Sequence, residues 1–393
     1  MPYRLARQRR RVLKSAVAAL ALAVVSPAFA ADALKIGLIL PLTGPFASTG
    51  KQIEAACRLY MQQNGDTVAG RKVELIVKDD TGVAPETTKR IAQELVVRDK
   101  VNVLAGFGLT PLALASAPIA TESKTPMIVM AAATSIITTK SPYIVRTGFT
   151  LPQVTFPIAE WAARNKIHTV VTLVADYAPG LDAEKTFVKR FAEAGGKVLD
   201  SLRVPLRNPD YAPFLQRAKD AKPDALFVFV PSGEGSAVMK QFADRGLKEA
   251  GIQMIGTGDV VDDDLLESMG SVAVGVVTSF HYSAAHDSPE NKKYVDSFMK
   301  TNHFRPNFMS VGGYDGMHLI YEAVKKAGAN ADGDKLVEAM KGMQWTSPRG
   351  PMQIDPATRD PIQNVYIRKV EMVDGKPWSV EFDKIENVKD PGV

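Results

Sequence analysis

From residue 34 to residue 129, short apolar runs alternate with longer amphipathic stretches. The runs are rich in Val, Ile and Leu, which is typical of strands that a parallel sheet buries on both faces. They cover residues 34–40, 73–77, 101–104 and 127–129. Helical periodicity fills the intervals at 49–64, 84–98 and 111–123. This alternation predicts a parallel sheet with helices on both faces.

The same alternation begins again after residue 148. The predicted strands are 170–174, 197–204, 225–230, 253–255 and 274–280, and the predicted helices are 152–165, 181–194, 211–221 and 235–246. Three more helices are expected at 289–301, 309–327 and 333–342. The tail alternates over 365–373 and 378–382 around Asp374-Gly375, which predicts a hairpin. The chain is therefore expected to form two α/β lobes.

The alternation breaks near residues 147–150, 281–283 and 349–355, and each break is a place where the chain can cross between lobes. Three crossings divide the chain into a first lobe, residues 32–147 plus 283–348, and a second lobe, residues 148–282 plus 349–393. We expect two doubly wound parallel-sheet lobes joined by three hinge crossings, with a ligand cleft between them.

Residues 1–30 read as an export signal. Six basic residues and no acidic one lie between Arg4 and Lys14. An apolar run follows over 16–25, and the stretch ends in Ala28-Phe29-Ala30. Ten apolar residues are too few to span a bilayer. We expect cleavage after Ala30 and a location in the periplasm.

The sequence is compatible with two export routes. Residues 8–14 resemble a twin-arginine signal, with Val12 where that pattern has Phe, and a twin-arginine substrate crosses the membrane already folded. An ordinary secretory signal with a basic start explains the same residues.

Removing the signal changes the charge of the protein. The full chain carries +5, and the signal contributes six positive charges, which leaves −1 for the remainder. The basic charge is thus no argument for binding nucleic acid or a membrane surface. Cys57 is the only cysteine, so no internal disulfide is expected, and its place on an apolar helix face predicts a buried position.

Enzyme and metal motifs are weak in this chain. The glycine pairs 106/108 and 256/258 lack the third glycine of a dinucleotide fingerprint. The five histidines show no metal-ligand spacing, and no Gly-x-Ser-x-Gly motif is present. We therefore expect a binding protein rather than an enzyme, with no cofactor and no metal.

Five short segments, in order and spacing, carry a resemblance to a known family. They are 35–37 (Lys-Ile-Gly), 41–45 (Pro-Leu-Thr-Gly-Pro), 79–81 (Asp-Asp-Thr), 131–134 (Ala-Ala-Ala-Thr) and 146–147 (Arg-Thr). Together they resemble the periplasmic binding proteins of branched-chain amino-acid (Leu/Ile/Val) transport, over essentially the whole exported chain. The resemblance implies a type I binding-protein fold that delivers a solute to an inner-membrane ABC permease and its ATPase. We expect the receptor to be a monomer.

The resemblance also implies a carboxylate site on the first lobe. Ala132 matches a position that binds through its backbone N–H, and Thr134 matches one that binds through its hydroxyl. The family's serine after the third strand is absent here, and Thr110 is the expected substitute. The alternative for Thr110 and Thr134 is that they only cap helices.

Aromatic side chains are expected on the walls of the cleft. Tyr177 matches a second-lobe tyrosine that closes over the ligand. Phe46 and Phe107 stand on loops at the ligand side and can supply apolar surface, although ordinary packing inside the lobe explains them equally well.

The ammonium pocket of the family's amino-acid binders is altered. Their glutamate falls at Gly258, beside Asp259, and their tyrosine falls near Ser232, close to Glu234. A buried ammonium needs a paired carboxylate. Either Asp259 or Glu234 supplies it, or the ligand has no ammonium.

We favour the second explanation, and with it a small aromatic acid such as a benzoate or a cinnamate. A branched-chain amino acid is the alternative ligand. The same fold also serves as a ligand-sensing domain for a signalling partner, and the sequence does not separate sensing from import.

Overall fold

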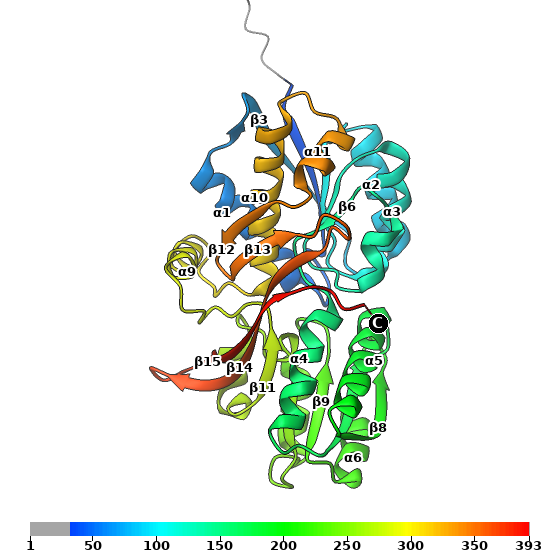
Figure 1. Ribbon diagram of the computed structural model, residues 1–393, viewed down its shortest axis with the longest axis vertical. Coiled ribbons are helices and arrows are strands. Elements are labelled where there is room, and N and C mark those ends of the chain that lie inside the picture. Colours follow the sequence, from blue (N-terminus) through cyan, green and yellow to red (C-terminus); the bar gives the residue numbers. More distant parts are fainter. Residues whose placement is uncertain (1–31, 393) are drawn as a thin grey trace, which may run out of the picture.

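Two sheets, each flanked by helices, build the molecule in a computed structural model that describes residues 32–392 (Figure 1). The predicted signal peptide and its cleavage after Ala30 lie outside the described residues. Within residues 32–392, no helix is both long enough and apolar enough to cross a membrane.

The first sheet has six strands in the order β2-β3-β1-β4-β5-β6. Only the β2–β3 pair is antiparallel. Helices α1 and α10 pack against each other on one side of this sheet, and α2 and α3 pack on the other (Figure 1). The strands are β1 (Leu34–Leu40), β2 (Thr67–Val68), β3 (Arg71–Asp79), β4 (Val103–Gly106), β5 (Met127–Val129) and β6 (Ile144–Arg146). The helices are α1 (Ala47–Asn64), α2 (Pro85–Val97), α3 (Thr110–Ser123), α9 (Pro289–Asn302), α10 (Phe308–Ala327) and α11 (Gly333–Met340).

The second sheet runs in the order β12-β13-β14-β11-β10-β9-β7-β8, and β15 pairs with β14. Its strands are β7 (Thr169–Ala175), β8 (Lys197–Val204), β9 (Ala225–Phe229), β10 (Gln253–Thr257), β11 (Val277–Phe280), β12 (Gln344–Ser347), β13 (Gly350–Ile354), β14 (Pro361–Val373) and β15 (Lys376–Val388). Its helices are α4 (Leu151–Arg164), α5 (Ala178–Glu193), α6 (Ala212–Ala221), α7 (Gly235–Asp244) and α8 (Leu266–Met269). The strands from β7 to β11 pair in parallel, as the apolar runs predict.

Local sequence explains where these helices begin and end. Proline stands in the first turn of α2 to α6 and of α9, where its missing N–H costs nothing. Thr150 caps α4 in a reciprocal pair of hydrogen bonds with Gln153. Helix α5 stops two residues before Gly195, whose φ of 88° a side chain would resist.

The structure confirms the α/β class and corrects several elements. The predicted strand 274–280 begins only at Val277, because Gly275 turns the chain with a φ of 93°. The hairpin is longer than predicted, since β14 and β15 have 13 residues each. The sequence analysis missed β2, β6, β12 and β13, which have two to five residues and are too short for a periodic signal.

The elements alternate between the sheets along the chain. Strands β1 to β6 build the first sheet and β7 to β11 the second; α9 and α10 then pack on α1, and β12 to β15 return to the second sheet. Strand β12 pairs in the second sheet although residues 344–347 fall in the range predicted for the first lobe. The lobe boundaries themselves stay a prediction.

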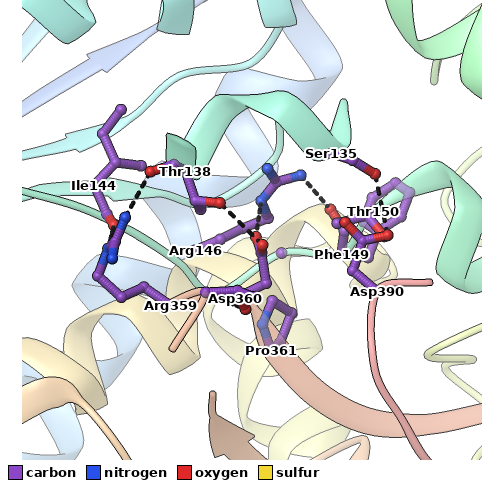
Figure 2. A network of polar contacts seen from close by, with 12 residues as sticks. Ser135, Thr138, Ile144, Arg146, Phe149, Thr150, Arg359, Asp360, Pro361 and Asp390 are labelled. Carbon is purple, nitrogen blue, oxygen red and sulfur yellow. Dashed lines mark hydrogen bonds and ion pairs between the residues drawn. The ribbon is translucent and has the colours of Figure 1, made fainter. Parts of the chain in front are cut away.

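A buried polar seam joins the first crossing to the third, and Figure 2 shows the part of it around Arg146 and Asp360. The Arg146 guanidinium pairs with Asp360 at 2.9 Å and donates to the carbonyls of Phe149 and Thr134. In the same seam, Arg349 pairs with Asp315 at 2.5 Å and donates to the carbonyls of residues 147 and 148. We refer to these two ion pairs and their carbonyl partners as the crossing seam.

Candidate functional site

A cavity lies between the lobes, at the carboxyl ends of strands from both sheets, where open α/β sheets place their ligands. The cavity is small, with a volume of about 20 Å³, so its lining side chains lie close to one another. Its lining comes from both lobes and includes Thr110, Ala133, Tyr177 and Asp259.

The first-lobe wall suits an anion. Thr110 is the first residue of α3, where backbone N–H groups have no partner inside the helix and the helix dipole is positive. Its Oγ1 lies 2.9 Å from Oγ1 of Thr134, so a bound oxygen and Thr134 can both hydrogen-bond to Thr110. Thr110 is 1% exposed, which removes competing water.

The loop over residues 131–134 offers a different N–H group from the one expected. The Ala132 N–H donates to the Phe107 carbonyl at 3.0 Å and is therefore already used. The N–H of Ala133, which also lines the cavity, has no hydrogen-bond partner among residues 32–392. A carboxylate at this wall would thus meet Thr110 and Ala133.

Aromatic rings form much of the remaining lining. Tyr177 stacks on Phe229 with 6.2 Å between ring centroids and 16° between ring planes. Phe46 and Phe149 add two further rings, and Phe46 packs with Leu109 in a small apolar cluster. These flat surfaces suit a planar apolar body.

Carboxylates mark the second-lobe wall. Asp259 lines the cavity from the turn after β10, and burial raises its pKa to about 7 against the opposing effect of the Thr257 hydroxyl, which donates to it at 2.9 Å. The Ser232 hydroxyl donates to Asp262 instead. Burial also raises the pKa of Asp263 to about 6 and that of Asp262 well above its usual range. Asp262 and Asp263 are buried but do not line the cavity. We call these three aspartates the acidic floor.

Gly258 has no room for a side chain. A Cβ at this position would overlap the guanidinium of Arg368 and the ring of Phe280. Arg368 is buried and donates to Thr278 and to the Tyr282 carbonyl. A cation therefore lies beside the position at which the family resemblance places a glutamate.

Six of the nine residues predicted from the sequence line this cavity. They are Phe46, Thr110, Ala132, Tyr177, Ser232 and Asp259. The other three lie elsewhere. Thr134 contacts the site through Thr110, Phe107 is buried in the core with a φ of 66°, and Glu234 accepts a hydrogen bond from Tyr211 at 3.3 Å.

The sequence analysis did not name several of the lining residues, among them Phe149, Leu151, Phe229 and Met309. Phe229 is the last residue of β9 and lies within the predicted strand 225–230, so its place near the carboxyl end of that strand was readable from the sequence. Phe149 follows the first crossing at a similarly readable place. Met309 reaches the cavity from α10, far along the chain from the other first-lobe lining residues, which end at Ala133, and no local signal indicates it.

The lobes contact each other around the cavity. Ser48 donates to Asp264 at 2.6 Å, and the Asn307 amide donates to the same carboxylate at 3.1 Å. Arg207 donates to the Val83 carbonyl at 2.6 Å. The structure is therefore that of a closed clamp.

Residues 32–392 contain no group of three His, Cys, Asp or Glu side chains that could hold a metal ion. Cys57 is buried, as predicted, and burial raises its pKa well above the usual range.

Comparisons with known proteins agree on one family. The family described as "Periplasmic binding protein" matches residues 33–376. The "Leu/Ile/Val-binding protein homolog 6" of Brucella abortus (strain 2308) is 44% identical over 384 residues, which cover 96% of this chain and 98% of the relative.

Two solved structures are similar over nearly their whole length. One is a solute-binding protein of an ABC transporter from Rhodopseudomonas palustris BisB5 in complex with 3,4-dihydroxybenzoic acid, with 62% identity, a TM-score of 0.90, and coverage of 91% of this chain and 99% of the other. The other, from Rhodopseudomonas palustris HaA2, is in complex with p-hydroxybenzoic acid, with 42% identity, a TM-score of 0.89, and coverage of 92% and 99%.

Proposed function

The chain belongs to the periplasmic binding protein family, and we propose that it captures an aromatic carboxylate for an ABC importer. The family is that of substrate-binding proteins, which supports a role in binding rather than catalysis. The ligands named for the two similar Rhodopseudomonas proteins are both aromatic acids, which supports this substrate class.

The observation that carries the proposal is the Arg368 guanidinium beside Gly258. An α-ammonium in this region would meet a buried cation instead of the glutamate that the amino-acid binders have, and like charges repel strongly where water is excluded. A ligand with a carboxylate and no ammonium avoids this cost. The aromatic lining then accommodates its ring.

The carboxylate is assigned to the first-lobe wall. Thr110 supplies its hydroxyl and its N–H at the start of α3, and Ala133 supplies a free N–H from the facing loop. In this assignment, Thr134 orients Thr110 through the 2.9 Å contact between their hydroxyls. The ligand thus binds the first lobe through its charge.

Closure follows from the two-lobed arrangement. A ligand that contacts Thr110 on one lobe and Tyr177 on the other stabilises the closed clamp over the open one. The moving units are the predicted lobes, 32–147 plus 283–348 and 148–282 plus 349–393. The expected partners are an inner-membrane permease and its ATPase, and the receptor is expected to act as a monomer in the periplasm.

A branched-chain amino acid is the second candidate. The observation in its favour is the Leu/Ile/Val-binding name of the Brucella relative at 44% identity. Such a ligand needs a partner for its ammonium, and Asp259 is the lining carboxylate that could serve.

Calorimetry with the protein purified from the periplasmic fraction tests the proposal. Benzoate, 4-hydroxybenzoate and 3,4-dihydroxybenzoate are compared with leucine and valine after bound ligand has been removed by unfolding and refolding. Binding of at least one aromatic acid and not of the amino acids is expected. Tight binding of leucine or valine alone would overturn the proposal.

Thr110→Val tests the carboxylate assignment. Hydrogen bonds to a charged group contribute about 1.5–3 kcal/mol, so affinity for the aromatic acid should fall roughly tenfold to 100-fold. Thr121→Val is the matched control, because Thr121 lies on the same helix and bonds to Ala117 and Ser141 away from the cavity. Equal affinities for the two variants would remove Thr110 from the site.

A further inference from the structure

The cavity presents hydrogen-bonding groups from two different sheets. Thr110 and Ala133 enter from the first lobe as donors, and Asp259 enters from the second lobe as a carboxylate. Aromatic side chains, among them Tyr177 and Phe229, line the space with them. A ring whose carboxylate lies on the donors therefore has its substituents facing the second-lobe wall.

One oxygen of Asp259 is free to accept a hydrogen bond. Its Oδ2 accepts from the Thr257 hydroxyl at 2.9 Å, and no other residue among residues 32–392 donates to its Oδ1. Asp259 is 3% exposed and lines the cavity, so a ligand there reaches a carboxylate that bulk water hardly touches. A carboxylate can accept several hydrogen bonds, and a ligand hydroxyl can donate one of them.

Two nearby donors are already used. The Ser232 hydroxyl donates to Asp262, and Arg368 donates to Thr278 and to the Tyr282 carbonyl. Burial, with a contribution from the Asp259 charge, raises the pKa of Tyr177, whose hydroxyl makes no hydrogen bond to Asp259. Asp259 is therefore available to a donor on the ligand.

We propose that Asp259 accepts a hydrogen bond from a hydroxyl group on the ring of the bound aromatic acid and thereby selects hydroxylated acids over unsubstituted ones. This inference rests on the proposed function and names the substrate within its class. Since the ligand carboxylate is held on the other lobe, the two polar contacts fix the direction in which the ring lies in the cleft.

The ionisation of Asp259 supports this role. Burial raises its pKa to about 7, so near neutral pH the empty site holds a mixture of charged and uncharged carboxyl. A hydroxyl donor favours the charged form, because hydrogen bonds to a carboxylate are the stronger ones. The other ionisable groups that act on Asp259 or feel its charge are Tyr177, Asp262 and Arg368.

A ligand series separates the hydroxyl donor from size and shape. Benzoate lacks the hydroxyl, 4-hydroxybenzoate has it, and 4-methoxybenzoate fills the same direction without a proton to donate. We expect 4-hydroxybenzoate to bind roughly tenfold to 100-fold more tightly than benzoate, and 4-methoxybenzoate to bind no more tightly than benzoate.

The variant Asp259→Ala should abolish this preference while benzoate still binds. Asp259→Asn keeps an acceptor oxygen without the charge, and it should retain part of the preference. Asp244→Asn is the control, since Asp244 is an exposed acid on α7 that pairs with Lys240. Circular dichroism establishes that each variant is folded.

The outcomes distinguish this inference from the proposed function. If benzoate and 4-hydroxybenzoate bind equally, or if Asp259→Ala weakens both to the same extent, the role of Asp259 is wrong while the receptor for aromatic acids stands. If no aromatic acid binds, both fail. If leucine binds and loses affinity in Asp259→Ala, the donor is an ammonium, and the hydroxyl assignment is overturned.

Discussion

The crossing seam and the acidic floor both bury charged side chains, yet they satisfy them differently. In the seam, Arg146 and Arg349 each pair with a carboxylate within 3 Å and donate their remaining N–H groups to carbonyls. In the floor, Asp259, Asp262 and Asp263 lie near one another, and Arg368 donates to other partners.

The comparison separates charges that are paired with each other from a carboxylate that faces a cavity. A buried ion pair fixes one geometry, and the seam does so where the chain passes between lobes. Asp259 instead lines the cavity and has a raised pKa, a combination that is typical of a binding site. Three predictions test this distinction, and they follow in order of decreasing effect.

Breaking the seam should have the largest effect. Asp315→Ala leaves Arg349 buried without its carboxylate, and Trp345 and Ser347 also lose an acceptor. Loss of one partner of a buried pair costs about 3–5 kcal/mol in the free energy of unfolding, which denaturant titration measures. The double variant Asp315→Leu with Arg349→Met should recover part of the loss. An unchanged unfolding midpoint in Asp315→Ala would contradict the structural role of the seam.

The raised pKa of Asp259 in the acidic floor should make the free energy of unfolding depend on pH. The folded-state pKa of Asp259 is about 7, above its unfolded value of about 3.9, so the folded protein binds more protons between these values. The raised pKa therefore adds to the free energy of unfolding at low pH. This contribution declines as the pH rises and is lost once the pH has passed through 7.

Asp259→Asn should make this decline shallower by about 1 kcal/mol between pH 6 and pH 8. Asp263, with a pKa raised to about 6, contributes mainly below that window. Free energies of unfolding measured at several pH values for both proteins give the difference. If the free energy of unfolding changes with pH in the same way in both proteins, the pKa of Asp259 is not raised.

The smallest effect is expected at the rim, where the lobes contact each other. Ser48→Ala removes a 2.6 Å hydrogen bond to Asp264 that joins the two lobes in the closed form. A loss of about 1 kcal/mol weakens ligand binding roughly fivefold, because only the closed state has this contact. Ser268→Ala is the control, since that hydroxyl donates to the Leu265 carbonyl within its own segment. Identical dissociation constants for the two variants would remove the contact from the closing mechanism.

The sequence predicted the architecture better than the site. Long Val- and Ile-rich runs separated by amphipathic helices specify parallel sheets, so β1, β5 and β8 were located to the residue. Thr110, Tyr177 and Asp259, which line the cavity, were named from the family resemblance. The linear pattern placed the loops that carry them at the ends of strands.

What the sequence did not indicate depends on contacts between distant segments. The Ala132 N–H is used by Phe107, and Arg368 reaches Gly258 from a strand 110 residues later. Met309 lines the cavity from a helix that joins the first lobe late in the chain. No spacing or periodicity reports such pairings, because the fold alone brings them together.

The near-complete burial of the lining has a kinetic consequence. Thr110 is 1% exposed and Asp259 is 3% exposed when the lobes are in contact, so a bound acid cannot leave past them by diffusion. Its dissociation then requires the lobes to separate, and ligand contacts that join the two lobes slow this step. A partner that holds the lobes apart would therefore release the acid faster than the receptor releases it alone.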